Sequence, residues 1–421
     1  MNLLIKAAHI IDINSPFHQK KADILIENGI ITKIGNNLDA QTTEIFEAEN
    51  LHVSIGWFDM HANIGDPGLE YKEDLKSGSE AASFGGFTAV ACMPTTNPPI
   101  HSKSEVEYIK NKAKDLAVEF LPIGALSHNR DGKELSEMFD MYQSGAIAFC
   151  DGKQAVESPG LLLRAMLYAK NFDAPIINFP DERSISKGGK MNEGHVSTLL
   201  GLKGMPSLSE ELMISRDIAL AEYNDCSIHF TTISSAKSVQ LIREAKSKGL
   251  KITADINAHQ LSIDDSYLKE FDTRYKVKPP FRTLADIKAL IEGLKDGTID
   301  AICSDHTPED IEDKKKEFDH AAFGIIALET CFAIANSSLK SSLSLDKIIE
   351  KLTINPRKIL KQNIPSIKEG EKANLTFFNP DHKWTFEKKH IKSKCANTPF
   401  IGKEFTGKAI ATFYNNSFNI C

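Results

Sequence analysis

The sequence predicts an α/β fold: a (β/α)8 TIM barrel together with a small β-sandwich domain that both termini build. In the middle of the 421-residue chain, eight strand-like runs alternate with segments of helical period. The two ends differ, because short β-rich runs separated by turn residues occur there instead. A doubly wound open sheet is the alternative arrangement for the alternating part.

The β-rich ends predict a composite domain. Near the N-terminus, the turn signals Asn14-Ser15-Pro16 and Asn28-Gly29 separate runs that are rich in branched side chains. The runs are residues 3–13, 23–26 and 30–34 at the N-terminal end, and residues 373–378 and 408–413 at the C-terminal end. We therefore expect a β-sandwich domain over residues 1–54 and 366–421, and a barrel over residues 55–365.

The alternating part predicts the barrel element by element. The strand-like runs are residues 55–61, 87–93, 118–125, 146–150, 175–179, 226–233, 250–256 and 299–304. The helical segments include residues 104–116, 159–171, 209–223, 236–248 and 284–294, with 329–337 and 345–352 after the last strand. Several strand runs are continuously apolar, as expected for strands that helices cover on both faces.

The composition excludes some classes of partner. Lys and Arg number 50 and Asp and Glu number 57, a net charge of −7, so neither nucleic acid nor an anionic membrane is expected as the main partner. No apolar run has the length of a membrane helix, and the glycine-rich nucleotide-binding motifs are missing. The seven cysteines form no CxxC pair, which is typical of reduced thiols, and we expect a cytoplasmic protein.

Polar residues gather where the predicted strands end, and a barrel forms its active site at that end. His61 and Asn63 close the first strand, Asp151 the fourth and Asp305 the eighth. These strand ends are therefore the candidates for a functional site.

Longer motifs resemble the dihydroorotases of the amidohydrolase superfamily, in particular the long bacterial type. The motifs are DPGLEYKED (66–74), GGFTAVACMPTTNPP (85–99), PIGAL (122–126), KMNEG (190–194), YKVKPPFR (275–282), GLKDGTIDAICSDHTP (293–308) and NTPFIGKEFTG (397–407). The resemblance covers nearly the whole chain. It implies the same barrel with a β-sandwich from both termini, and the reversible hydrolysis of dihydroorotate to carbamoyl aspartate in pyrimidine biosynthesis.

Three of the six metal-ligand positions that the resemblance implies are retained. The family takes them from an HxH motif on strand 1, an acid on strand 4, one His each on strands 5 and 6, and an Asp on strand 8. The retained positions are His61, Asp151 and Asp305, of which Asp305 would be the catalytic acid/base. The other three positions hold Asn63, Phe179 and Thr232. At most one zinc or other divalent ion is therefore expected, or none.

Substrate-contacting positions differ from the family pattern as well. The resemblance implies an Arg after HxH that grips a carboxylate, and Gly65 stands there. Thr95, Lys278 and Glu309 replace further polar residues of the pattern. Lys153 and Lys278 could return positive charge, although an exposed lysine is the ordinary state of a loop. The substrate-binding residues are left unassigned.

Ordinary structural roles compete with these functional ones. His61 and Asp305 could be hydrogen-bonded remnants in a barrel mouth, and Asp151 could cap the segment that follows it. His229 lies inside an apolar strand and is interpreted as a core histidine. His306 could orient the Asp305 carboxylate.

Three functional hypotheses follow. The first is a dihydroorotase-like pseudoenzyme with a structural or regulatory role, for which the resemblance implies aspartate transcarbamoylase as partner and a homo-oligomer, a dimer or larger. The second is an active dihydroorotase or related cyclic amidase with one metal on His61, Asp151 and Asp305. The third is a protein that binds dihydroorotate or carbamoyl aspartate in the old pocket without turnover.

Overall fold

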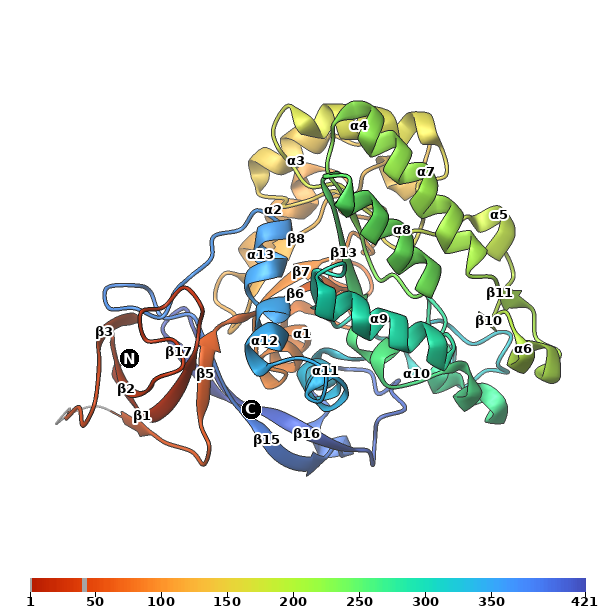
Figure 1. The fold of residues 1–421 in the computed structure, drawn as a ribbon. Coiled ribbons are helices and arrows are strands. Elements are labelled where there is room, and N and C mark those ends of the chain that lie inside the picture. Colours follow the sequence, from red (N-terminus) through yellow and green to blue (C-terminus); the bar gives the residue numbers. More distant parts are fainter. Residues whose placement is uncertain (1, 40–43) are drawn as a thin grey trace.

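The computed structural model describes residues 2–39 and 44–421, and it contains a barrel of strands wrapped by helices with a β-sheet at its side (Figure 1). The chain runs from the sheet into the barrel and returns to the sheet at its end. None of the described helices is long and apolar enough to cross a membrane.

Parallel strands form the barrel in two arcs, ordered β6-β7-β8 and β9-β12-β13-β14. Single β-bridges from Phe149 to Gly124 and to Ile176 join the arcs, and a bridge between Ala62 and His306 closes the ring. The strands are β6 (Trp57–Ala62), β7 (Phe87–Cys92), β8 (Glu119–Pro122), β9 (Ile177–Asn178), β12 (Ile228–Phe230), β13 (Ile252–Asn257) and β14 (Ala301–Cys303). The predicted barrel is therefore confirmed, although its fourth strand consists of bridges alone.

Helices cover the outside of the barrel (Figure 1). The longer ones are α1 (Leu75–Phe84), α2 (Lys103–Ala113), α3 (Met138–Ser144), α4 (Pro159–Lys170), α7 (Leu208–Asn224), α8 (Ala236–Ser247), α9 (Leu284–Asp296), α11 (Cys331–Leu339), α12 (Leu345–Leu352) and α13 (Ile354–Ile359). The connections also hold α5 (Arg183–Ser186), α6 (His195–Leu200), α10 (Ile311–Lys314), β10 (Met191–Asn192) and β11 (Gly204–Met205).

Helix α9 illustrates how the sequence sets these boundaries. Thr283 forms a capping box at its N-terminus, which satisfies amide groups that the helix leaves free. Ile287, Leu290 and Leu294 recur at helical spacing and are buried against the barrel. Gly297 then ends the helix in the left-handed conformation, with φ of 82°, which glycine adopts without strain because it has no Cβ atom.

The sheet beside the barrel combines both ends of the chain. Its order is β17-β16-β15-β5-β1-β2-β3, and β4 pairs with β1. The strands are β1 (Asn2–Ile11), β2 (Lys21–Glu27), β3 (Ile30–Gly35), β4 (Glu44–Phe46), β5 (His52–Ile55), β15 (Leu375–Thr385), β16 (Glu404–Tyr414) and β17 (Ser417–Ile420). Antiparallel pairing of β5 with β15 joins the two ends, as the β-rich runs predict.

Trp57 fixes this sheet against the barrel. Its indole ring lies 4.5 Å from the ring of Phe332 on α11 and 5.4 Å from that of Phe378 on β15, measured between centroids. The indole N–H donates to the Ser54 hydroxyl at 2.9 Å, so the buried polar atom is satisfied. The first barrel strand therefore starts from a well-packed aromatic cluster.

Candidate functional site

The polar strand ends that the sequence singles out meet at the mouth of the barrel. His61 ends β6, Asp305 follows β14, and Thr232 follows β12. Thr232 and Asp305 both have φ of 53°, in the left-handed region. A β-branched residue is rarely found there, and such strain concentrates at functional sites. The backbone conformation at these two positions therefore marks the mouth as a candidate site.

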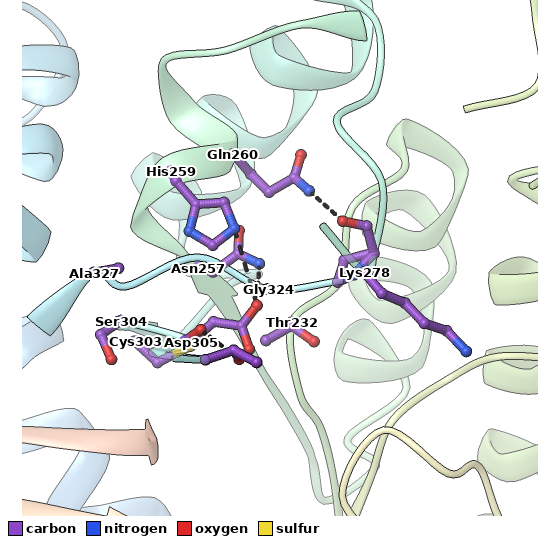
Figure 2. A network of polar contacts seen from close by, with 12 residues as sticks. Thr232, Asn257, His259, Gln260, Lys278, Cys303, Ser304, Asp305, Gly324 and Ala327 are labelled. Carbon is purple, nitrogen blue, oxygen red and sulfur yellow. Dashed lines mark hydrogen bonds and ion pairs between the residues drawn. The ribbon is translucent and has the colours of Figure 1, made fainter. Parts of the chain in front are cut away.

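Lys153 and Asp305 form the centre of the mouth. The Lys153 ammonium lies 2.6 Å from Asp305 Oδ1 and 2.7 Å from Oδ2, although this carboxylate side chain is only 2% exposed. The Asn257 amide also donates to Oδ2, at 3.1 Å, as Figure 2 shows. The buried carboxylate therefore has an ammonium partner and a hydrogen-bond donor inside the mouth.

Two buried imidazoles face the same carboxylate. Nε2 of His61 lies 3.5 Å from Oδ1 of Asp305, and Nε2 of His259 lies 3.9 Å from Oδ2 (Figure 2 shows His259). Burial lowers the pKa of His61, and it lowers that of His259 to about 4, so both rings are neutral at pH 7. His61 Nδ1 bonds the Thr231 hydroxyl at 2.8 Å. Neither Nε2 atom has a hydrogen-bond partner among the described residues.

Asp151 points to a different loop. Its carboxylate accepts hydrogen bonds from the Ser127 amide at 2.9 Å and the Ser127 hydroxyl at 2.5 Å. Of the three ligands that the sequence predicts, the structure therefore brings together His61 and Asp305, while Asp151 is engaged elsewhere. In the part of the chain that the structure describes, no group of three His, Cys, Asp or Glu side chains is arranged to hold a metal ion.

The three substituted ligand positions hold side chains that cannot ligate a metal ion as a histidine does. Asn63 donates to the His306 carbonyl and the Thr307 hydroxyl at 3.0 and 2.9 Å, and its own oxygen accepts from Thr95 at 2.8 Å. Phe179 is buried, with its ring 5.4 Å from the Lys278 ammonium. The Thr232 hydroxyl is buried, and its backbone amide donates to a carboxylate of β13. None of them replaces a histidine.

The neighbouring histidines have structural partners. His229 bonds the Asp255 carboxylate at 2.8 Å and the Thr253 hydroxyl at 2.9 Å, so the interpretation as a satisfied core histidine is confirmed. His306 contacts Glu73 at 3.3 Å rather than Asp305. The interpretation that His306 orients Asp305 is therefore wrong, because its two ring nitrogens contact the Glu73 carboxylate and the Ala327 amide.

A cavity of about 270 Å³ opens at the mouth beside this network. Asn63, Gly65 and Thr95 line it together with Lys153 and Arg130. Arg130 is the residue that the sequence analysis missed. Its only signal is its place in the loop that follows the third barrel strand, where a charged residue can face the mouth.

Known proteins resemble this chain over nearly its whole length. A family model described as dihydro-orotase-like matches residues 52–238. A dihydroorotase of Acetivibrio thermocellus is 40% identical over 418 residues, covering 99% of this chain and 98% of its own. The chain belongs to the dihydroorotase family. A dihydroorotase of Caldicellulosiruptor saccharolyticus is 41% identical over 420 residues, 98% of this chain and 97% of its own.

Solved structures of other proteins have the same fold as this chain. The L-hydantoinase (dihydropyrimidinase) of Arthrobacter aurescens superposes with a TM-score of 0.87 at 23% identity, over 99% of this chain and 95% of that one. A D-hydantoinase from Thermus sp. gives 0.83 at 22% identity, over 99% and 94%. The amidohydrolase barrel with its terminal β-domain is therefore established.

The donor set of this dihydroorotase-family mouth does not fit the metal centre that the family resemblance implies. Asn63 and Thr232 offer only neutral oxygens, Phe179 offers none, and the Asp151 carboxylate is bonded to Ser127. A divalent ion on Asp305 would also lie within a few Å of the Lys153 ammonium, where like charges repel. Lys153 therefore contacts the Asp305 carboxylate that the implied ion would need as a ligand.

Proposed function

We propose that this chain is a dihydroorotase-like protein of pyrimidine biosynthesis that has lost hydrolytic activity and acts as a structural or regulatory partner. The observation that carries the proposal is the Lys153 ammonium within 2.7 Å of both oxygens of Asp305. Its free cysteines, buried except for the half-buried Cys421, are in keeping with a reducing cytoplasm.

Hydrolysis of a cyclic amide needs a polarised carbonyl and an ionised water near neutral pH. Both oxygens of Asp305 contact the Lys153 ammonium, so a water that gives its proton to Asp305 would have to displace Lys153. The alternative is a one-metal enzyme on His61, Asp151 and Asp305. It would require Lys153 to leave Asp305 and Asp151 to leave Ser127. Both moves break contacts of buried charges, which favours the inactive form.

A turnover assay tests the loss of activity. The purified chain is incubated with dihydroorotate, and separately with carbamoyl aspartate, after loading with zinc, cobalt or manganese. The Acetivibrio thermocellus dihydroorotase, prepared in parallel, is the positive control. We expect no interconversion above the rate of the Asp305→Ala variant of this chain. Metal-dependent turnover that this variant loses would overturn the proposal and establish the one-metal enzyme.

The partner that we propose is aspartate transcarbamoylase, in an assembly with two or more copies of this chain. An exposed aromatic cluster on α3 and α4 supports an interface. The rings of Phe139, Tyr142 and Tyr168 lie 5.1–5.4 Å from that of Phe172, and each of the three is 37–40% exposed. Exposed aromatic groups of this kind are typical of interface centres.

Light scattering after size exclusion tests the assembly. The chain is run alone and mixed with aspartate transcarbamoylase from the same organism. We expect a complex that the Phe139→Ser/Tyr168→Ser variant fails to form, and that the Tyr223→Ser variant still forms, because Tyr223 is an isolated exposed ring on α7. A chain that stays a monomer in the presence of the transcarbamoylase would contradict the proposed partnership.

A further inference from the structure

The backbone at residue 65 leaves no room for the arginine that the family resemblance implies there. A Cβ atom added to Gly65 would lie 2.3 Å from the Leu69 carbonyl oxygen and 3.0 Å from that of Glu73. The Leu69 amide also donates to the Gly65 carbonyl at 2.6 Å, so this loop packs tightly onto the glycine. A cation for the cavity must therefore come from another element.

Arg130 supplies that cation. It lines the same cavity as Gly65 and Thr95, and it reaches there from the loop after β8. Its Nε donates to the Asp151 carbonyl at 3.0 Å. Its two terminal nitrogens have no hydrogen-bond partner among the described residues, which leaves the forked end of the guanidinium free to bind a planar anion.

The lysines of the cavity wall are already neutralised. Lys72 pairs with Glu309 at 2.6 Å, Lys278 pairs with Asp181 at 2.6 Å, and Lys153 holds Asp305. Within the described chain, Arg130 is thus the cation of this wall that has no carboxylate in ion-pair contact. The Asp151 carboxylate acts on this guanidinium only from beyond ion-pair distance, so a bound carboxylate could still contact its two terminal nitrogens.

The loop that carries Arg130 is held in a specific shape. Asn129 and Arg130 both adopt the left-handed conformation, with φ of 51° and 58°, which costs energy for residues other than glycine. Asp151 fixes the loop through both bonds to Ser127, and the Gly132 amide donates to the Ser127 hydroxyl at 2.9 Å. Asp151, at the position of a family metal ligand, thus acts as a positioning residue for Arg130.

We infer that the mouth binds a small carboxylate ligand through a two-pronged contact with Arg130. The inference rests on the proposed function, because it assigns a ligand class to the same mouth. The cavity volume of about 270 Å³ suits a small molecule. The side-chain amide of Gln154, which has no partner in the described chain, offers a second polar contact at the rim.

Calorimetry and thermal melting with matched ligands test the inference. Dihydroorotate and carbamoyl aspartate are the carboxylate probes. Dihydrouracil has the same ring as dihydroorotate without the carboxylate, and inorganic phosphate is the general anion. We expect dihydroorotate or carbamoyl aspartate to bind and raise the melting temperature, and dihydrouracil and phosphate to do neither. Binding of neither carboxylate, or equal binding of dihydrouracil or phosphate, would overturn the inference.

Substitutions then locate the contact. Arg130→Gln should weaken binding of the carboxylate about tenfold to hundredfold, and Arg130→Lys should restore part of it. Arg164→Gln, an exposed arginine on α4 outside the cavity, should leave binding unchanged. Melting of each variant without ligand checks its folding. Unchanged affinity in a folded Arg130→Gln variant would remove Arg130 from the site. Turnover of the bound ligand would overturn the proposed function alone, because it leaves the Arg130 contact standing.

Discussion

The ammonium of Lys153 lies within 2.7 Å of both carboxylate oxygens of Asp305, at the centre of the barrel mouth. The two residues are 152 positions apart in the chain and belong to the fourth and eighth barrel positions. The Lys153 ammonium thus contacts the carboxylate that the family resemblance implies as a metal ligand.

Removing one partner of this pair should destabilise the protein. Lys153→Met leaves the Asp305 carboxylate buried without a counter-charge, and we expect a loss of about 2 kcal/mol or more in the free energy of unfolding. Lys153→Met combined with Asp305→Asn should lose less than the sum of the single changes, with a coupling of about 1–3 kcal/mol. Urea denaturation measures all three variants. Additive losses would mean that the two side chains are not coupled.

Gly65 should be intolerant of any side chain. Gly65→Ala forces a Cβ to within 2.3 Å of the Leu69 carbonyl oxygen, and relief requires backbone movement, so we expect a loss of about 1–3 kcal/mol. Gly160→Ala is the matched control, because a Cβ there meets only the end of the Arg164 side chain, at 3.6 Å. Thermal melting compares the two variants. Equal melting temperatures would show that the loop gives way easily.

Asp151→Asn should loosen the loop of residues 127–132. An amide can replace only one of the two acceptor oxygens that Ser127 uses, and we expect amide hydrogen exchange in this loop to accelerate about tenfold. Asp140→Asn, an exposed carboxylate on α3, should leave the exchange unchanged. Exchange followed by mass spectrometry separates the loop from the rest of the chain. A protected loop in Asp151→Asn would contradict the positioning role.

Lys314 should make stability depend on alkaline pH. Its side chain donates to the carbonyls of Ala322 and Gly324 at 3.0 Å, and burial lowers its pKa from 10.5 to about 8, with Lys276 adding to this and Glu309 opposing it. Between about pH 8 and 10 the unfolded state holds more protons than the folded state, so stability rises with pH.

The pH series compares the wild type with Lys314→Met. The difference in unfolding free energy should grow in favour of the wild type by about 1 kcal/mol per pH unit between pH 8 and 10. Below pH 8 both states hold the proton, and the difference should be constant. A difference that is constant over the whole range would mean that Lys314 keeps its ordinary pKa when folded.

The barrel could be predicted because its signals are local. Runs such as residues 89–93 are continuously apolar, and amphipathic segments such as residues 284–294 repeat at helical spacing, so each element can be located from its own neighbourhood. Chain order then places His61 and Asp305 at one mouth, since parallel strands end on the same side. The fourth strand was overestimated, because Phe149 forms only single bridges.

The chemistry of the mouth could not be predicted in the same way. Whether Lys153 is exposed or bound to Asp305 depends on a contact across the barrel, and no local pattern encodes it. Asp151 matched a ligand position, yet its carboxylate turns to Ser127. Arg130 carries no motif at all, and its place in the cavity wall is visible only when its surroundings are known.

Zinc content is the measurement that tests the central claim most directly. The chain and its Asp305→Ala variant are expressed with added zinc, dialysed against metal-free buffer and analysed for bound metal per chain. If Lys153 has taken the place of the ion, both proteins should hold the same trace of zinc. One zinc per chain in the wild type, lost in Asp305→Ala, would show that a metal displaces Lys153 and would contradict the account.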